Sequence, residues 1–142
     1  MSKRRNAREL ALKVLFQVDV GHLSPDEALQ TWEEEVRPAA EDRDYVDELV
    51  RGIASSEAEL DEIIAELAEG WKIDRLAKVD KNVLRIALYE LIHHPDSTPN
   101  TVVNDAVEVV KKYSTDDSGR FVNGILGSYL RRREETNPAS RK

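Results

Sequence analysis

The segment DKNVLRIALYELI, residues 80–92, is apolar on almost every side, and this constrains the fold more than any other part of the sequence. Among its last ten residues only Arg85, Tyr89 and Glu90 are polar. A helix with so little polar surface is stable in water only when other helices surround it. The segment therefore predicts the central helix of a bundle, with Asp80 as its N-cap.

Amphipathic helical stripes dominate the rest of the chain, and no segment shows sustained strand alternation. Ser24 with Glu27 and Ser56 with Glu59 match the capping-box pattern, and residues 116–118 offer an N-cap to a last helix. Together with the central helix, about seven helices with short connections predict an all-α fold, as one bundle or a pair of bundles. The other expected helices cover residues 7–18, 25–36, 42–53, 56–67, 99–113 and 116–130.

Length and composition indicate a single domain without disulfides or a membrane span. A chain of 142 residues is long enough to bury a sizeable core, so we expect one domain over residues 1–133. The tail, residues 134–142, lacks an apolar anchor and is expected to be disordered. The absence of cysteine excludes thiolate metal sites and fits a reducing cytoplasm. No stretch approaches about 18 consecutive apolar residues, so we expect a soluble protein with no membrane partner.

Charge is strongly segregated along the chain, although its net value is −7. Residues 1–18 hold five Lys and Arg against one acid, residues 19–69 hold three against seventeen, and residues 70–142 hold thirteen against ten. A ligand senses mainly the charges within the Debye length, about 8 Å at physiological salt. A polyanion could therefore bind a basic part of this protein despite the acidic total.

The sequence offers no recognisable catalytic or metal-binding constellation. His22 stands alone, and His93 and His94 are neighbours whose side chains point about 100° apart on a helix. This pair is explained by a favourable interaction with the helix C-terminal dipole. The HExxH, GxSxG, P-loop and GxGxxG patterns are absent. We therefore expect a protein that is not an enzyme and holds no cofactor or metal.

Three arginines, Arg4, Arg5 and Arg8, fall on one side of the first expected helix. At 3.6 residues per turn they lie at about 40°, 140° and 80°, so their guanidinium groups could crowd together. Arginine matches phosphate oxygens bidentately, so the cluster favours an anionic ligand. The alternative is an unstructured basic arm that serves solubility. Nearby, Phe16 is placed to stack on a base or fill a partner's pocket, or it packs against a neighbouring helix.

The stretch STDDSGRFVNGIL, residues 114–126, combines an apolar helical pattern with poor helix formers. Gly119, Asn123 and Gly124 each cost roughly 0.5–1 kcal/mol relative to alanine. Such residues are typical of a close backbone approach or of a polar group needed at a defined place. Close packing of the last helix would by itself explain the glycines. Phe121 offers a flat ring to an unstacked base, or it belongs to the core.

Three segments, RRNARELALKVLFQ, DKNVLRIALYEL and DSGRFVNGIL, resemble in order and spacing the most recognisable parts of the NusB family of bacterial transcription antitermination factors. The resemblance implies two small helical bundles packed at a steep angle. It also implies binding of the single-stranded boxA element of ribosomal RNA leader transcripts, together with ribosomal protein S10. With other antitermination factors, such a complex helps RNA polymerase to resist termination.

The resemblance also assigns residues to two binding surfaces. It implies RNA contacts at Arg4, Arg5, Arg8, Arg120, Phe121 and Asn123, and S10 contacts at Phe16 and Asp80. Asn6 stands where some relatives carry another arginine, so one RNA contact is expected to be weaker.

A competing class is a helical protein-interaction scaffold or homodimer that does not recognise RNA. The net charge of −7 and the acidic region 19–69 favour that class. DNA binding through a helix-turn-helix is disfavoured, because no short glycine-containing turn precedes a basic recognition helix. Discrimination between a boxA-type RNA and a scrambled RNA would separate RNA recognition from the scaffold.

Overall fold

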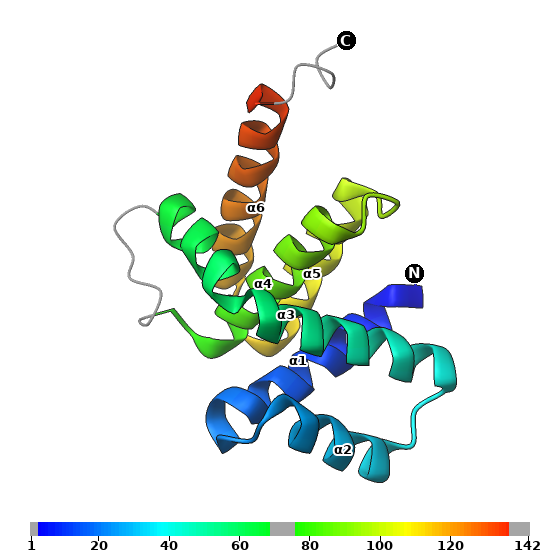
Figure 1. Cartoon of the computed structure of the whole chain (residues 1–142). Coiled ribbons are helices and arrows are strands. Elements are labelled where there is room, and N and C mark those ends of the chain that lie inside the picture. The colour runs from blue at the N-terminus through cyan, green and yellow to red at the C-terminus, as the bar shows by residue number, and fades with distance from the viewer. Residues whose placement is uncertain (1–2, 69–75, 137–142) are drawn as a thin grey trace.

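The computed structural model describes residues 3–68 and 76–136, which form six α-helices and no strand (Figure 1). The predicted all-α class is confirmed. Within the same residues no helix is long and apolar enough to cross a bilayer. The helices are α1 (Lys3–Gly21), α2 (Pro25–Val36), α3 (Ala40–Leu67), α4 (Lys78–His93), α5 (Pro99–Tyr113) and α6 (Asp116–Thr136).

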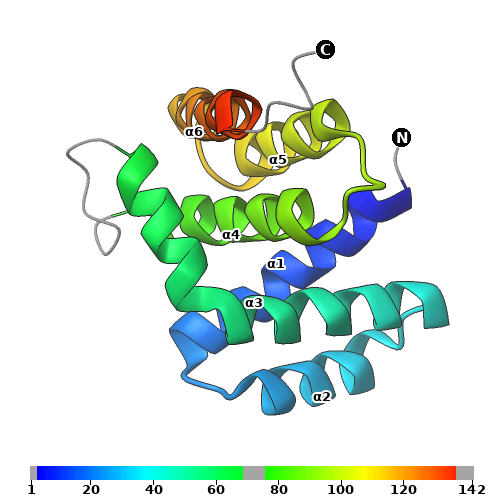
Figure 2. The same cartoon turned by 45° about the horizontal axis from the view of Figure 1, so that its top comes forward.

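The helices form two groups, α1 to α3 and α4 to α6, with α4 in contact with both (Figure 2). Helix α4 packs against α1, α3, α5 and α6, as its apolar circumference predicts. Every residue of α4 from Asn82 to Leu91 is buried. In Figure 1, α6 runs steeply across the direction of α2, in agreement with the expected steep packing of two bundles.

Helix α3 is one continuous helix that bends near its middle, where the sequence predicted two helices (Figure 2). The capping box at Ser24 and Glu27 is present, with both hydrogen bonds at 3.1 Å. The one predicted at Ser56 is wrong, because Ser56 lies inside α3. Gly52 allows close contact with α4, since a Cβ there would overlap the phenol of Tyr89. The glycine therefore serves close packing of α3 on α4 and does not end the helix.

Two other predicted helix starts are also corrected. Helix α4 begins at Lys78 with Ala77 as its N-cap, so Asp80 lies in the first turn and is not the cap. Helix α6 begins at Asp116, and the Oγ1 atom of Thr115 accepts the backbone N–H of Ser118 at 3.1 Å. Thr115 therefore makes the capping contact that was expected from residues 116–118. Helix α6 continues to Thr136, into the segment expected to be disordered, and residues 137–142 lie outside the described part of the chain.

A buried arginine of α4, Arg85, fixes this helix against its neighbours. Its guanidinium contacts both carboxylate oxygens of Asp61 at 2.7 and 2.8 Å, and Glu57 at 3.0 Å. Burial alone would lower the Arg85 pKa, but the hydrogen bonds and charges of Asp61, Glu57 and Asp19 raise it above its ordinary value. Arg85 is therefore charged and paired inside the protein, and it ties α4 to the second half of α3.

The same glycine-to-alanine substitution should have opposite effects at two helical positions. Gly52→Ala should lower the free energy of unfolding by about 1–3 kcal/mol, because the new methyl group overlaps Tyr89. Gly124→Ala should raise it by about 0.5–1 kcal/mol, because a Cβ there meets no atom within 4 Å and alanine is the better helix former. Urea denaturation of both variants measures the two shifts, and shifts of equal sign would contradict the packing described.

Candidate nucleic-acid interface

The three arginines expected to cluster on α1 point to three different places. Arg4 donates to Ser97 Oγ at 3.0 Å, and its guanidinium lies 4.7 Å from the centre of the Tyr45 ring. Arg5 is half-buried, and its positive charge acts on Glu9. Arg8 points into the protein. The predicted single cluster is therefore wrong, because Arg8 is buried against α4 and α5 while Arg4 is held by Ser97 and Tyr45.

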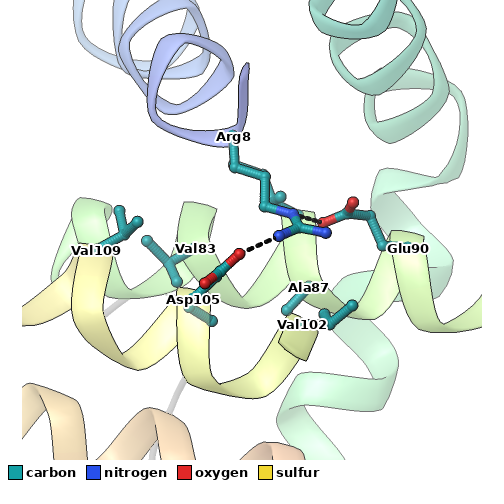
Figure 3. Close-up of a pocket in the computed structure, with 9 residues that line it drawn as sticks. Arg8, Val83, Ala87, Glu90, Val102, Asp105 and Val109 are labelled. Carbon is teal, nitrogen blue, oxygen red and sulfur yellow. Dashed lines mark hydrogen bonds and ion pairs between the residues drawn. The ribbon is translucent and has the colours of Figure 1, made fainter. Parts of the chain in front are cut away.

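Arg8 is 5% exposed and is held between two carboxylates (Figure 3). Its Nε atom donates to Glu90 of α4 at 2.6 Å, and its Nη1 atom donates to Asp105 of α5 at 2.5 Å. Glu90 is fully buried and also accepts a hydrogen bond from the hydroxyl of Tyr45 on α3. The expectation that Arg8 lies at the RNA-facing surface is therefore wrong. Its guanidinium connects α1 to α4 and α5 from the inside.

This buried network is electrostatically consistent with a charged Arg8 and a neutral Tyr45. Burial alone would lower the Arg8 pKa, but the hydrogen bond and charge of Glu90 and the charge of Asp105 raise it. Burial raises the pKa of Tyr45, and its hydrogen bond to the Glu90 carboxylate raises it further. Apolar side chains, among them Val83 and Val102, line the space around the ion pairs (Figure 3). Loss of Arg8 would leave the carboxylates of Glu90 and Asp105 without their cation in an apolar environment.

A second contact joins α1 to the end of α5. The carboxylate of Glu9 accepts from Lys112 Nζ at 3.0 Å and from the Tyr113 hydroxyl at 3.1 Å. Burial would raise the Glu9 pKa, but these hydrogen bonds and the charges of Lys112 and Arg5 lower it overall. The contact places the basic end of α5 beside Arg5. This contact was not predicted from the sequence, although Lys111 and Lys112, one residue before the stretch 114–126, were a signal.

A surface groove of about 350 Å³ lies between the end of α5 and the start of α6. Its lining comprises Val107 and Lys111 from α5 and Asp116, Gly119, Arg120 and Asn123 from α6. Arg120 is exposed and forms an ion pair with Asp117, three residues earlier. The groove thus brings together two predicted RNA-binding residues and adds Lys111. Cationic and amide groups around an open groove are suited to phosphate and base recognition.

Phe121 and the two predicted S10-contact residues lie outside this groove. Phe121 is half-buried and packs against the core, in agreement with the alternative that it belongs to the core. Phe16 is half-buried on α1, one turn before Val20, which is 47% exposed. Asp80 is buried and accepts a hydrogen bond from Ser118 Oγ at 2.8 Å, so its carboxylate faces the start of α6. Partner contacts by Phe16 and Asp80 stay predictions.

The fold and this surface define a two-bundle helical protein with a groove, lined by Lys111, Asp116 and Arg120, between the end of α5 and the start of α6. The chain belongs to the NusB family, whose model matches residues 5–131. It is similar to the transcription antitermination protein NusB of Symbiobacterium thermophilum, with 44% identity over 136 residues that cover 90% of this chain and 89% of the relative.

Solved structures agree with this assignment. The fold matches NusB of T. maritima with a TM-score of 0.83 and 32% identity, covering 90% of each chain. It also matches a chain in the crystal structure of the antitermination factors NusB and NusE in complex with dsRNA. That match has a TM-score of 0.81 and 34% identity, and covers 90% of this chain and 96% of the other.

Removing the buried guanidinium should cost far more stability than removing an exposed cation of the same helix. Arg8→Met should lower the free energy of unfolding by about 3–5 kcal/mol, because Glu90 and Asp105 lose their buried partner. Lys13→Met, at an exposed position of α1, should change it by no more than about 0.5 kcal/mol. Chemical denaturation of both variants provides the comparison, and equal losses would argue against a buried network.

The contact of Glu9 with Lys112 and Tyr113 should make stability depend on pH. Because folding lowers the Glu9 pKa, its contribution is present above the unfolded pKa and is lost as the pH falls through the folded pKa. Wild type should therefore exceed Glu9→Gln in free energy of unfolding at pH 7, and the difference should shrink below about pH 4.3. Denaturation of both proteins from pH 3 to pH 7 measures it. A difference that grows toward acid would contradict the assigned sign.

Proposed function

We propose that this protein is an RNA-binding transcription antitermination factor. It binds boxA-type single-stranded leader RNA together with ribosomal protein S10 and promotes processive transcription of ribosomal RNA operons, in a larger complex with other antitermination factors and RNA polymerase. It acts by binding rather than by catalysis, and it works in the cytoplasm. The observation that carries the proposal is the groove between α5 and α6, where Lys111, Arg120 and Asn123 converge in a chain of the NusB family.

The comparisons support both kinds of partner. The solved complex of NusB with NusE and dsRNA contains a chain that is 34% identical to this one. NusE is ribosomal protein S10, the protein partner in the proposed function. The relative from Symbiobacterium thermophilum is named for transcription antitermination, and its match spans 90% of this chain.

In the proposed mechanism, surface cations neutralise the RNA backbone while polar and aromatic groups contact bases. Arg4, Arg5 and Arg120 supply guanidinium groups, and Asn123 supplies an amide. Arg8 acts indirectly, because its contacts with Glu90 and Asp105 fix the position of α1 against α4 and α5. RNA binding at Arg120 requires a phosphate to compete with Asp117 for the same guanidinium.

A titration of purified protein into labelled RNA tests this function. The probes are a short boxA-type RNA, a scrambled single strand of equal length and a duplex form, each measured with and without S10. Tighter binding of the boxA-type RNA, strengthened by S10, is the expected result. Equal binding of all RNAs in both conditions would favour the scaffold or homodimer that does not recognise RNA.

Neutralising Asp117 should strengthen RNA binding. Asp117→Asn removes the carboxylate that pairs with Arg120, and it leaves the capping contact of Thr115 in place. At low salt the RNA affinity should rise by about two- to fivefold, the scale of one exposed ion pair. The control is Asp44→Asn, an equal charge change at an exposed position of α3. Weaker binding by Asp117→Asn, measured in the same titration, would contradict competition between Asp117 and RNA.

A further inference from the structure

The groove between α5 and α6 is shaped by an unusually close approach of Lys111 to Gly119. A Cβ at Gly119 would lie 2.8 Å from Lys111 Cγ and 3.1 Å from Lys111 Cδ. The absence of a side chain at Gly119 therefore lets the lysine stem lie across the first turn of α6. Its ammonium group is 3.9 Å from the carboxylate of Glu108, and both side chains are about half exposed. Such a pair is weak enough to be exchanged for a phosphate.

The exposed side of α6 that begins at this groove has an arginine at each end and two glycines between them. At 3.6 residues per turn, Arg120, Gly124, Gly127 and Arg131 fall within about 60° of the helix circumference and span about 16 Å. A Cβ at Gly124 would meet no atom within 4 Å, so packing of the described chain does not require glycine there. Glycine is among the least favourable residues inside a helix. This position thus differs from Gly52 and Gly119, where a neighbouring side chain occupies the space.

The chemistry of this side of α6 fits a nucleic-acid backbone better than a partner helix. Arg120 and Arg131 are exposed at its two ends, and Asn123 is exposed beside Gly124. Arg131 donates to Ser128 Oγ at 3.1 Å, which holds its guanidinium along the helix surface. A partner helix would find no apolar side chain to bury on this face. A sugar–phosphate chain, in contrast, gains from both guanidinium groups and from close access to the helix between them.

We infer that the backbone of the bound RNA leaves the α5–α6 groove along this side of α6, with Lys111 and Arg131 as phosphate contacts and Gly124 at the point of closest approach. The inference rests on the proposed function and extends it to residues that no comparison assigns. Because the stretch from Arg120 to Arg131 is about 16 Å long, it seats several nucleotides rather than a single phosphate.

Three single variants test this path with the boxA-type RNA, in the presence of S10 and across a range of salt. Arg131→Gln should weaken binding and reduce the negative salt slope by about 0.7, the value for one phosphate contact on a single strand. Gly124→Ala should weaken binding by about three- to tenfold while the protein becomes more stable. Arg132→Gln is the matched control, because Arg132 lies about 100° around the helix and pairs with Glu66 at 3.6 Å. It should leave the salt slope unchanged.

The outcomes separate this inference from the proposed function. If wild type discriminates boxA-type RNA but Arg131→Gln and Gly124→Ala bind it as wild type does, the path along α6 is wrong and the proposed function stands. If these variants lose S10 binding in the absence of RNA, the surface is a protein contact and the inference is overturned. If wild type itself fails to discriminate, both the function and the path are overturned.

Discussion

The position of α1 depends on one buried guanidinium. Arg8 reaches Glu90 and Asp105 from two other helices at 2.6 and 2.5 Å, and Glu90 is shared with Tyr45 of α3. A buried charge is tolerated only when it is paired and hydrogen-bonded. Apolar packing would accept small shifts of α1, but these contacts are satisfied together in only one arrangement of α1, α3, α4 and α5. The network therefore specifies the register between the two groups of helices.

This register determines where the binding surface forms. Glu9 follows Arg8 directly on α1 and receives Lys112 and Tyr113 at the end of α5. The turn into α6, and with it the groove of Lys111, Arg120 and Asn123, is thereby held next to Arg5. An arginine that contacts no ligand can thus be essential for binding, because it positions the residues that do.

The sequence predicted the helices well and the tertiary partners poorly, for a physical reason. The spacing of apolar residues along a helix indicates which of its sides are buried. The central position of α4 was therefore predicted correctly from residues 80–92 alone. This spacing does not indicate which residue of another helix a polar side chain contacts. Glu90 and Asp105 lie 82 and 97 positions from Arg8, so a helical wheel of α1 placed its guanidinium with Arg4 and Arg5. Two helices were expected where α3 is continuous, because the sequence does not show that Gly52 lies inside a helix in close contact with Tyr89 of α4.

The contrast between buried and exposed ion pairs explains how an acidic protein can bind a polyanion. Several cations of the interface already have a carboxylate of the same chain as partner: Arg120 pairs with Asp117, and Lys111 with Glu108. Exposed pairs of this kind contribute about 0–1 kcal/mol each, so a phosphate can replace the carboxylate at little cost. Separating Arg8 from Glu90 and Asp105 would instead leave buried charges unpaired, at about 3–5 kcal/mol. Buried arginines of this chain therefore stabilise the fold, whereas exposed arginines can leave a carboxylate of the same chain and bind an RNA phosphate.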